Sequence, residues 1–141
     1  HLTIKKLNLK IVDSSIYFEL AHSLGVPEKG LSNLKEQLFG LEANFEELNA
    51  IDFKKGCYVG QENTARMKLK NKIRKKLLAV KIDGDIEVGE DLKFGEIKIG
   101  KILIDKPHSF ALVKLFDPDF SDFKNKELNC ENAKVKIINS Y

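Results

Sequence analysis

The residues best suited to chemistry lie in segment 54–62, which reads KKGCYVGQE and which we call the signature loop. Gly56 and Gly60 bracket three residues, so the backbone there can turn sharply and approach a ligand closely. We expect the lysines before Cys57 and the amide groups of a following helix to lower the pKa of its thiol, and Glu62 to act in the opposite direction. The pattern predicts a binding loop with Cys57 as the catalytic candidate, although a small packed cysteine fits the spacing equally well.

Three polar or aromatic residues of the signature loop could contact a planar ligand. A carboxylate accepts hydrogen bonds from paired N–H groups and an amide both donates and accepts, so Glu62 and Gln61 suit a heteroaromatic ring such as a pterin. Tyr58 could stack on the same ring. The plainer alternative gives Glu62 a helix-capping role, Gln61 contact with solvent and Tyr58 ordinary packing.

Charge is unevenly distributed around the signature loop. Residues 42–52 carry four acids and no base, and residues 66–76 carry seven bases and no acid. Such a basic run is usually a solvated face or linker. It could also meet a phosphate, an RNA backbone or a polyglutamate tail, but no aromatic residues interleave it to stack bases, so we do not expect direct nucleic-acid binding.

The elements that must position the loop are helices before the loop and strands after it. Loose alternation predicts a strand over 2–12, and apolar spacing predicts helices over 14–24 and within 30–40. Segment 41–53 has no period and predicts an ordered loop. A further helix is expected from Tyr58 or Val59 to Leu69, because its first turn is acidic and its last turn basic.

Short segments rich in branched residues fill the second half of the chain. They predict strands over 77–82, 91–94, 97–104, 110–116 and 133–138, joined by turns. Hairpin connections imply an antiparallel sheet that curls into a small barrel, with a bulge at Gly100. The fold class is therefore α+β, with an α/β region over 1–74 and a β-barrel over 75–141.

Composition restricts the class of protein. The 141 residues are 43% hydrophobic and 32% charged, and the net charge is +3. No stretch approaches the about 20 apolar residues of a membrane span, so we expect a cytoplasmic monomer without membrane contact. Cys57 and Cys130 lie far apart without ligand spacing, which predicts reduced thiols and no metal site. The chain begins at His1, so it is treated as a possible fragment.

The signature loop, followed by Ala65 and Arg66, resembles the fingerprint of the YgfZ family, relatives of the glycine-cleavage T-protein. LEANF at 41–45 and the 17–27 helix ending in LGVP are similar to family segments upstream, and the strand-rich region looks like the family's C-terminal barrel. Ala21 and Gly40 depart from the arginine and proline usual at those positions. The resemblance covers nearly the whole chain, but only the later half to two-thirds of a family member.

This resemblance implies a tetrahydrofolate-binding accessory protein for assembly or repair of iron–sulfur enzymes, with an indirect effect on tRNA modification. Its partners would be folate and iron–sulfur enzymes or assembly proteins, and the folate pocket would be assembled mainly by preceding domains. Besides Cys57, the candidate folate-binding residues are Glu42, Asn44, Lys55, Gly56, Tyr58, Gly60, Gln61 and Glu62. A single motif cysteine is too few to ligate a cluster.

Two other functions remain open at this point. One is a folate-dependent aminomethyltransferase like the T-proteins, which typically carry an aspartate-containing stretch where this chain has the cysteine. The other is a basic RNA-binding module that uses residues 66–76.

Overall fold

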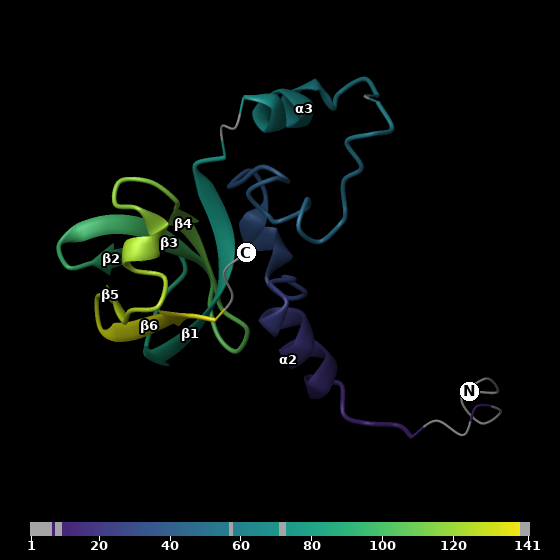
Figure 1. Cartoon of the computed structure of the whole chain (residues 1–141). Helices are drawn as coiled ribbons and strands as arrows, with labels where there is room; N and C mark the ends of the chain where they lie inside the picture. Colours follow the sequence, from purple (N-terminus) through teal and green to yellow (C-terminus); the bar gives the residue numbers. More distant parts are fainter. Residues whose placement is uncertain (1–6, 8–9, 57, 71–72, 139–141) are drawn as a thin grey trace.

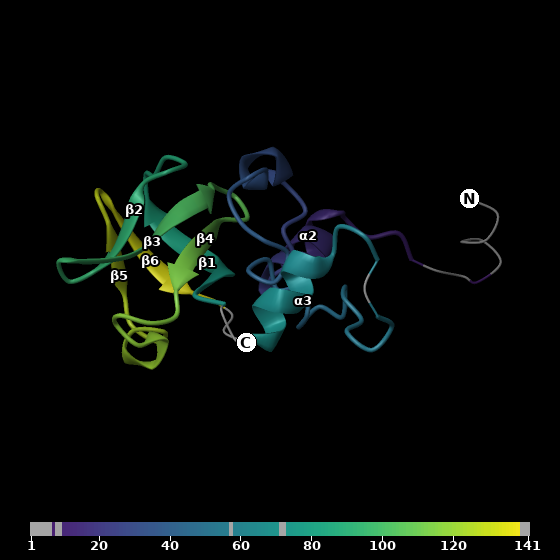
Figure 2. The same cartoon turned by 90° about the horizontal axis from the view of Figure 1, so that it is seen from above.

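The computed structural model describes residue 7 and residues 10–56, 58–70 and 73–138. A β-barrel lies beside a segment that carries the helices α2 (Ser15–Ser23) and α3 (Glu62–Leu69) and the 3-10 helix η1 (Leu31–Leu34), as Figures 1 and 2 show from two directions. The arrangement is compatible with the predicted α+β class. The division into domains at residues 74 and 75 stays a prediction.

Six antiparallel strands close the barrel in the order β1-β4-β3-β2-β5-β6, which confirms the predicted architecture. Their bounds are β1 Lys75–Gly84, β2 Asp91–Phe94, β3 Ile97–Ile104, β4 Phe110–Lys114, β5 Leu128–Cys130 and β6 Ala133–Ile137. The sequence did not predict β5, which has only three residues yet joins β2 to β6. The bulge expected at Gly100 is confirmed, since the β2 and β3 register shifts between Leu92 opposite Gly100 and Lys93 opposite Lys98.

Strand β1 is buried on both faces along Leu77–Val80. Leu78 and Val80 belong to the barrel interior, together with residues of all six strands and Phe123. Leu77 and Ala79 belong to a second core on the outside of the barrel, against which Leu34 and Leu38 pack. This second core explains why the sequence reads as a continuous apolar run there instead of alternating.

Helix α2 confirms the predicted first helix and is tied to the barrel. The left-handed Gly25 (φ 73°) ends it, and the amide of Val26 donates to the Ala21 carbonyl at 2.8 Å. The Nε2 atom of His22 lies 2.8 Å from the Ser109 carbonyl oxygen, and because that oxygen can only accept, the imidazole donates. The His22 ring meets Phe110 edge-on at 5.1 Å between centroids.

Three local predictions differ from the structure. Within 30–40 only η1 forms, because Glu36 takes a left-handed φ of 59° that stops a helix. Helix α3 begins at Glu62 instead of Tyr58 or Val59, since Gly60 is left-handed with φ 92°. Of the strand predicted over 2–12, residues 10–12 adopt no strand and pair with no sheet, and residues 1–6 and 8–9 lie outside the described residues.

Two hydrogen bonds attach the helical segment to the backbone of one residue of β1, Leu77. The Leu77 amide donates to the Glu42 carbonyl at 2.7 Å, and the Asn44 side-chain Nδ2 donates to the Leu77 carbonyl at 2.6 Å. Strand β6 pairs with β1 only from Val80 onwards, so Leu77 presents a sheet edge that β6 leaves open. Segment 41–45 therefore occupies this edge, and we call the two bonds the Leu77 clamp.

Asn44 is suited to the clamp by its backbone as well as its amide. Its φ is 62°, a left-handed value that asparagine tolerates better than most residues, and it is fully buried. Its Oδ1 atom is also buried and has no hydrogen-bond partner among the described residues, so the fold uses the donor of this side chain. A buried unpaired carbonyl costs about 1–3 kcal/mol, which makes the donor to Leu77 energetically important.

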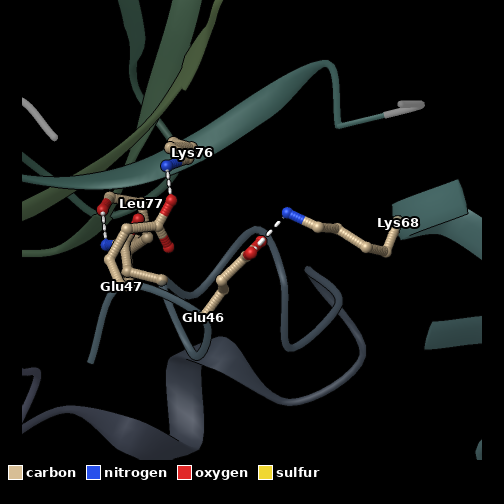
Figure 3. A network of polar contacts seen from close by, with 6 residues as sticks. Glu46, Glu47, Lys68, Lys76 and Leu77 are labelled. Atoms are coloured by element: carbon tan, nitrogen blue, oxygen red, sulfur yellow. Dashed lines mark hydrogen bonds and ion pairs between the residues drawn. The ribbon is translucent and has the colours of Figure 1, made fainter. Parts of the chain in front are cut away.

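Two ion pairs flank the clamp, as Figure 3 shows. Glu47 pairs with Lys76, the neighbour of Leu77 on β1, and both side chains are largely buried. Glu46 pairs with Lys68 of α3, where the side chains are 32% and 45% exposed. The acidic segment 42–52 and the basic run 66–76 thus meet in part. The exposed pair contributes at most about 1 kcal/mol.

Replacing Asn44 with alanine should lower the free energy of unfolding by about 2–4 kcal/mol, because the Leu77 carbonyl loses its donor and alanine resists the left-handed backbone. Urea unfolding measures the change. Asn49 is the matched control, since it also has a left-handed φ (55°) but is exposed. Asn49→Ala should cost about 1 kcal/mol, and equal losses in the two variants would refute the clamp.

Candidate functional site

The signature loop is held by short polar contacts that place its lysine and glutamine together. The Nζ atom of Lys55 donates to Oε1 of Gln61 at 2.9 Å and lies 4.6 Å from the Tyr58 ring centroid. The Lys54 amide donates to Oδ1 of Asp52 at 2.8 Å. Gly56 has φ 83°, and a left-handed value there, as at Gly60, lets the chain reverse twice in five residues.

Glu62 closes the end of the loop. Its Oε2 accepts a hydrogen bond from the Gly60 amide at 3.0 Å, at the first residue of α3. Gly60 precedes the N-cap residue Gln61, so this contact fixes the turn before α3, and α3 has no side-chain cap hydrogen bond.

A cavity of about 150 Å³ lies between the signature loop, α3 and the preceding segment. Its lining combines apolar, hydroxyl, amide and charged groups and is formed by Ala50, Ile51, Asp52, Phe53, Lys55, Gly56, Gln61, Thr64 and Ala65. Pockets for whole drug-sized ligands measure about 300–1,000 Å³. This cavity therefore fits one ring of a ligand.

Three of the predicted site residues line this cavity, namely Lys55, Gly56 and Gln61. Tyr58, Gly60 and Glu62 belong to the loop but not to the lining. Glu42 and Asn44 lie outside both the loop and the lining. The Glu42 carboxylate accepts a hydrogen bond from the Phe39 amide at 2.9 Å. The backbone carbonyl of Glu42 and the side-chain amide of Asn44 form the Leu77 clamp. The assignment of these residues to a folate site stays a prediction.

Sequence reasoning missed three polar or aromatic lining residues, Asp52, Phe53 and Thr64. Asp52 and Phe53 directly precede the signature loop. An acidic residue and an aromatic residue next to a glycine-rich turn could have indicated ligand contacts at these positions. Asp52 brings an acceptor that can take paired N–H groups, the role that was expected of Glu62. Phe53 is 38% exposed and offers a ring face or edge.

The tip of the signature loop is apolar and open to solvent. Tyr58 is 72% exposed and Val59 is 99% exposed. Such residues at a loop tip contribute nothing to the core and are typical of a contact surface. Cys57, the predicted catalytic residue, lies between Gly56 and Tyr58 but outside the described residues.

Cys130 differs from a reactive thiol in every respect that the structure shows. It is fully buried in the barrel core, and its Sγ donates to Glu90 Oε2 at 3.3 Å. Burial, followed by the Glu90 carboxylate, raises the pKa of the Cys130 thiol from 9.0 to about 12. Cys130 is therefore protonated at neutral pH and acts as a packed apolar residue.

The described part of the chain holds neither a group of metal-ligating residues nor a membrane-spanning helix. Within residues 7, 10–56, 58–70 and 73–138, histidine, cysteine, aspartate and glutamate nowhere gather in threes as metal ligands. Across the same ranges, none of the helices is long and apolar enough to span a membrane.

Known proteins with similar sequences share one description. The chain is 46% identical over 55 residues to the mitochondrial iron–sulfur cluster assembly factor IBA57 homolog of Neurospora crassa, covering 39% of this chain and 12% of that protein. It is 39% identical over 75 residues to IBA57 of Mus musculus, covering 52% and 21%. Its relatives are iron–sulfur cluster assembly factors. No protein-family model matches the chain.

A third relative shows where the similarity must lie. IBA57 of Saccharomyces cerevisiae is 34% identical over 88 residues, which cover 60% of this chain and 18% of that protein. A continuous stretch of that share must include the centre of a 141-residue chain, roughly residues 60–80, and hence α3 and the start of β1. The chain spans only about an eighth to a fifth of the length of these three relatives.

The comparisons correct the expected location. The sequence predicted a cytoplasmic protein, because it showed neither a membrane span nor a secretory signal. All three relatives are named as mitochondrial proteins, which contradicts that prediction. Amino-acid composition does not distinguish the two compartments, because mitochondrial and cytoplasmic domains bury apolar residues and expose polar residues in the same way.

The raised pKa of Cys130 predicts how stability depends on pH. Between pH 9.0 and about 12 the folded thiol keeps a proton that the unfolded thiol loses, so the unfolded state is favoured as pH rises. The free energy of unfolding should fall by up to about 1.4 kcal/mol per pH unit from this group. Cys130→Ala should lack this component when urea unfolding is compared at pH 8 and pH 10.

Cys57→Ala is the control, because it also removes a thiol but leaves the barrel core intact. It should keep the steep loss of stability above pH 9. Parallel pH profiles for the parent chain and Cys130→Ala would show that Cys130 titrates normally.

Proposed function

We propose that this chain is part of an accessory protein for the assembly or repair of iron–sulfur enzymes and that the signature loop is its working surface. The observation that carries this proposal is the similarity to iron–sulfur cluster assembly factors of the IBA57 type. The closed barrel would then be the C-terminal barrel of a T-protein-like fold of the YgfZ type. An effect on tRNA modification would follow indirectly, through a cluster-dependent enzyme.

The cavity beside the loop supports a tetrahydrofolate ring as the ligand. A pterin edge carries paired N–H donors, and Asp52 offers a carboxylate at the cavity while Gln61 can both donate and accept. Phe53 and Ile51 supply apolar surface for the flat faces. The cavity fits the ring alone, so the rest of the ligand would extend past Lys55 to surfaces outside it.

The loop tip supports docking of a protein partner. Val59 is 99% exposed, so its aliphatic side chain contacts water. A polar residue at this position would be hydrated without loss of stability, so folding does not require a valine here. We expect such a partner to meet Cys57 as well, because Cys57 directly precedes Tyr58 in the sequence. This arrangement would bring a folate-adjacent thiol to an iron–sulfur protein.

Among the described residues, no contact favours the aminomethyltransferase alternative. An enzymatic assay decides whether that alternative holds. Release of methylene-tetrahydrofolate from a lipoyl-bound aminomethyl donor would establish it.

Lys55→Met should weaken tetrahydrofolate binding by about tenfold, because Gln61 loses the donor that orients its amide and the cavity loses its cation. Isothermal titration calorimetry of the 141-residue chain at high protein concentration measures the affinity. Lys54→Met is the matched control, since Lys54 is adjacent but does not line the cavity. Equal weakening in both variants would show that only net charge matters.

Val59→Asp should abolish rescue of a cell that lacks its own related factor, measured as the activity of iron–sulfur enzymes in extracts. A charge at the tip opposes an apolar contact but leaves folding intact, because Val59 touches almost nothing. Leu69→Asp is the matched control, because Leu69 is also an apolar residue with high exposure (86%) but lies outside the signature loop. Cys57→Ala should also fail to rescue.

Full rescue by Val59→Asp would exclude docking through the tip. Full rescue by Cys57→Ala would exclude a role for the thiol. Loss of rescue in Leu69→Asp as well would mean that any surface charge impairs the protein.

A further inference from the structure

A second hollow lies at the end of the barrel where β1 begins and β4 ends. It measures about 520 Å³, is lined by Arg74, Lys75, Lys114, Phe116 and Asp117, and is called here the basic hollow. Lys75 and Lys114 are directly paired across β1 and β4. The Leu115 amide donates to the Arg74 carbonyl at 2.9 Å, which extends this pairing and fixes the backbone around the hollow.

The cations of the basic hollow differ from the nearby lysines in their ion pairs. Among the residues that the structure describes, Arg74, Lys75 and Lys114 form no ion pair, whereas the nearby Lys68 and Lys76 each pair with a glutamate. Like charges directly opposite each other on paired strands destabilise a sheet. A bound anion would attract both lysines and so offset their mutual repulsion.

A lysine pair alone does not make a site, and the barrel itself shows this. Lys81 and Lys136 are likewise directly opposite each other, on β1 and β6, and both are exposed. Neither of them lines the cavity beside the signature loop or the basic hollow. The basic hollow differs because it has volume, a third cation and an aromatic wall.

Phe116 and the volume indicate what kind of anion would fit. The Phe116 side chain is 55% exposed at the edge of the hollow and can stack against a planar ring. About 520 Å³ falls in the range of small-molecule sites, well above the needs of a simple ion. Arginine and lysine together suit a chain of phosphates, and Asp117 can accept hydrogen bonds from sugar hydroxyls.

We propose that the basic hollow binds a nucleoside di- or triphosphate, with the phosphates among Arg74, Lys75 and Lys114 and the base against Phe116. This site is separate from the cavity beside the signature loop and does not depend on the proposed folate function. Its cations come from the end of the basic run and from β4, which the chain brings together only when the barrel closes.

Calorimetric titration of the 141-residue chain with ATP, pyrophosphate and adenosine tests the proposal. ATP should bind more tightly than pyrophosphate, and adenosine should bind weakest, because the phosphates carry the charge and the base adds stacking. The double variant K75Q/K114Q should weaken ATP binding at least tenfold. The matched control K81Q/K136Q removes the same charge from the same sheet and should change the affinity less than twofold.

Phe116→Ala separates base recognition from phosphate recognition. It should weaken ATP binding severalfold and leave pyrophosphate binding unchanged. Thermal unfolding should show K75Q/K114Q to be at least as stable as the parent chain, since a repulsive pair is removed.

Three results would overturn the proposal. The first is an equal loss of ATP affinity in K75Q/K114Q and K81Q/K136Q, which would mean attraction by net charge alone. The second is no difference between ATP and pyrophosphate in the parent chain. The third is tighter binding of single-stranded oligouridylate than of ATP, lost in the same variant, which would make the hollow an RNA site.

Discussion

The two hydrogen bonds at Leu77 are the constraint on which the arrangement of this protein depends. They join a backbone carbonyl and an asparagine side chain of segment 41–45 to the one stretch of β1 that β6 leaves unpaired. An open strand edge normally invites pairing with another chain. Here the edge is filled from within, and the filling segment leads directly into the cavity and the signature loop.

The clamp also explains how a loop without regular structure can hold a site. The barrel has two cores, one inside and one outside on β1, β3 and β4, so β1 is a rigid support. Leu34 of η1 packs against the outer core. The ion pairs of Glu46 and Glu47 hold the segment that contains the clamp to α3 and β1. The signature loop follows a segment that is held to both α3 and β1, and loops on such supports commonly carry function.

Sequence reasoning predicted the elements whose signals are local. Branched residues and turns predicted five of the strands, and apolar spacing predicted α2. It missed β5, because three residues carry too little pattern, and it did not predict the hydrogen bond from Asn44 to Leu77, because the two residues lie 33 positions apart. Asp52 and Phe53 were missed as cavity residues for a related reason, since Thr64 and Ala65 of α3 complete that cavity only in three dimensions.

We infer that the Leu77 clamp positions a ligand cavity beside the signature loop. Amide chemical-shift mapping of the ¹⁵N-labelled chain during titration with tetrahydrofolate tests it most directly. We expect the largest shifts within residues 50–65, with the amides of β2, β5 and β6 unchanged. Shifts centred on the barrel, or none at saturating ligand, would contradict it.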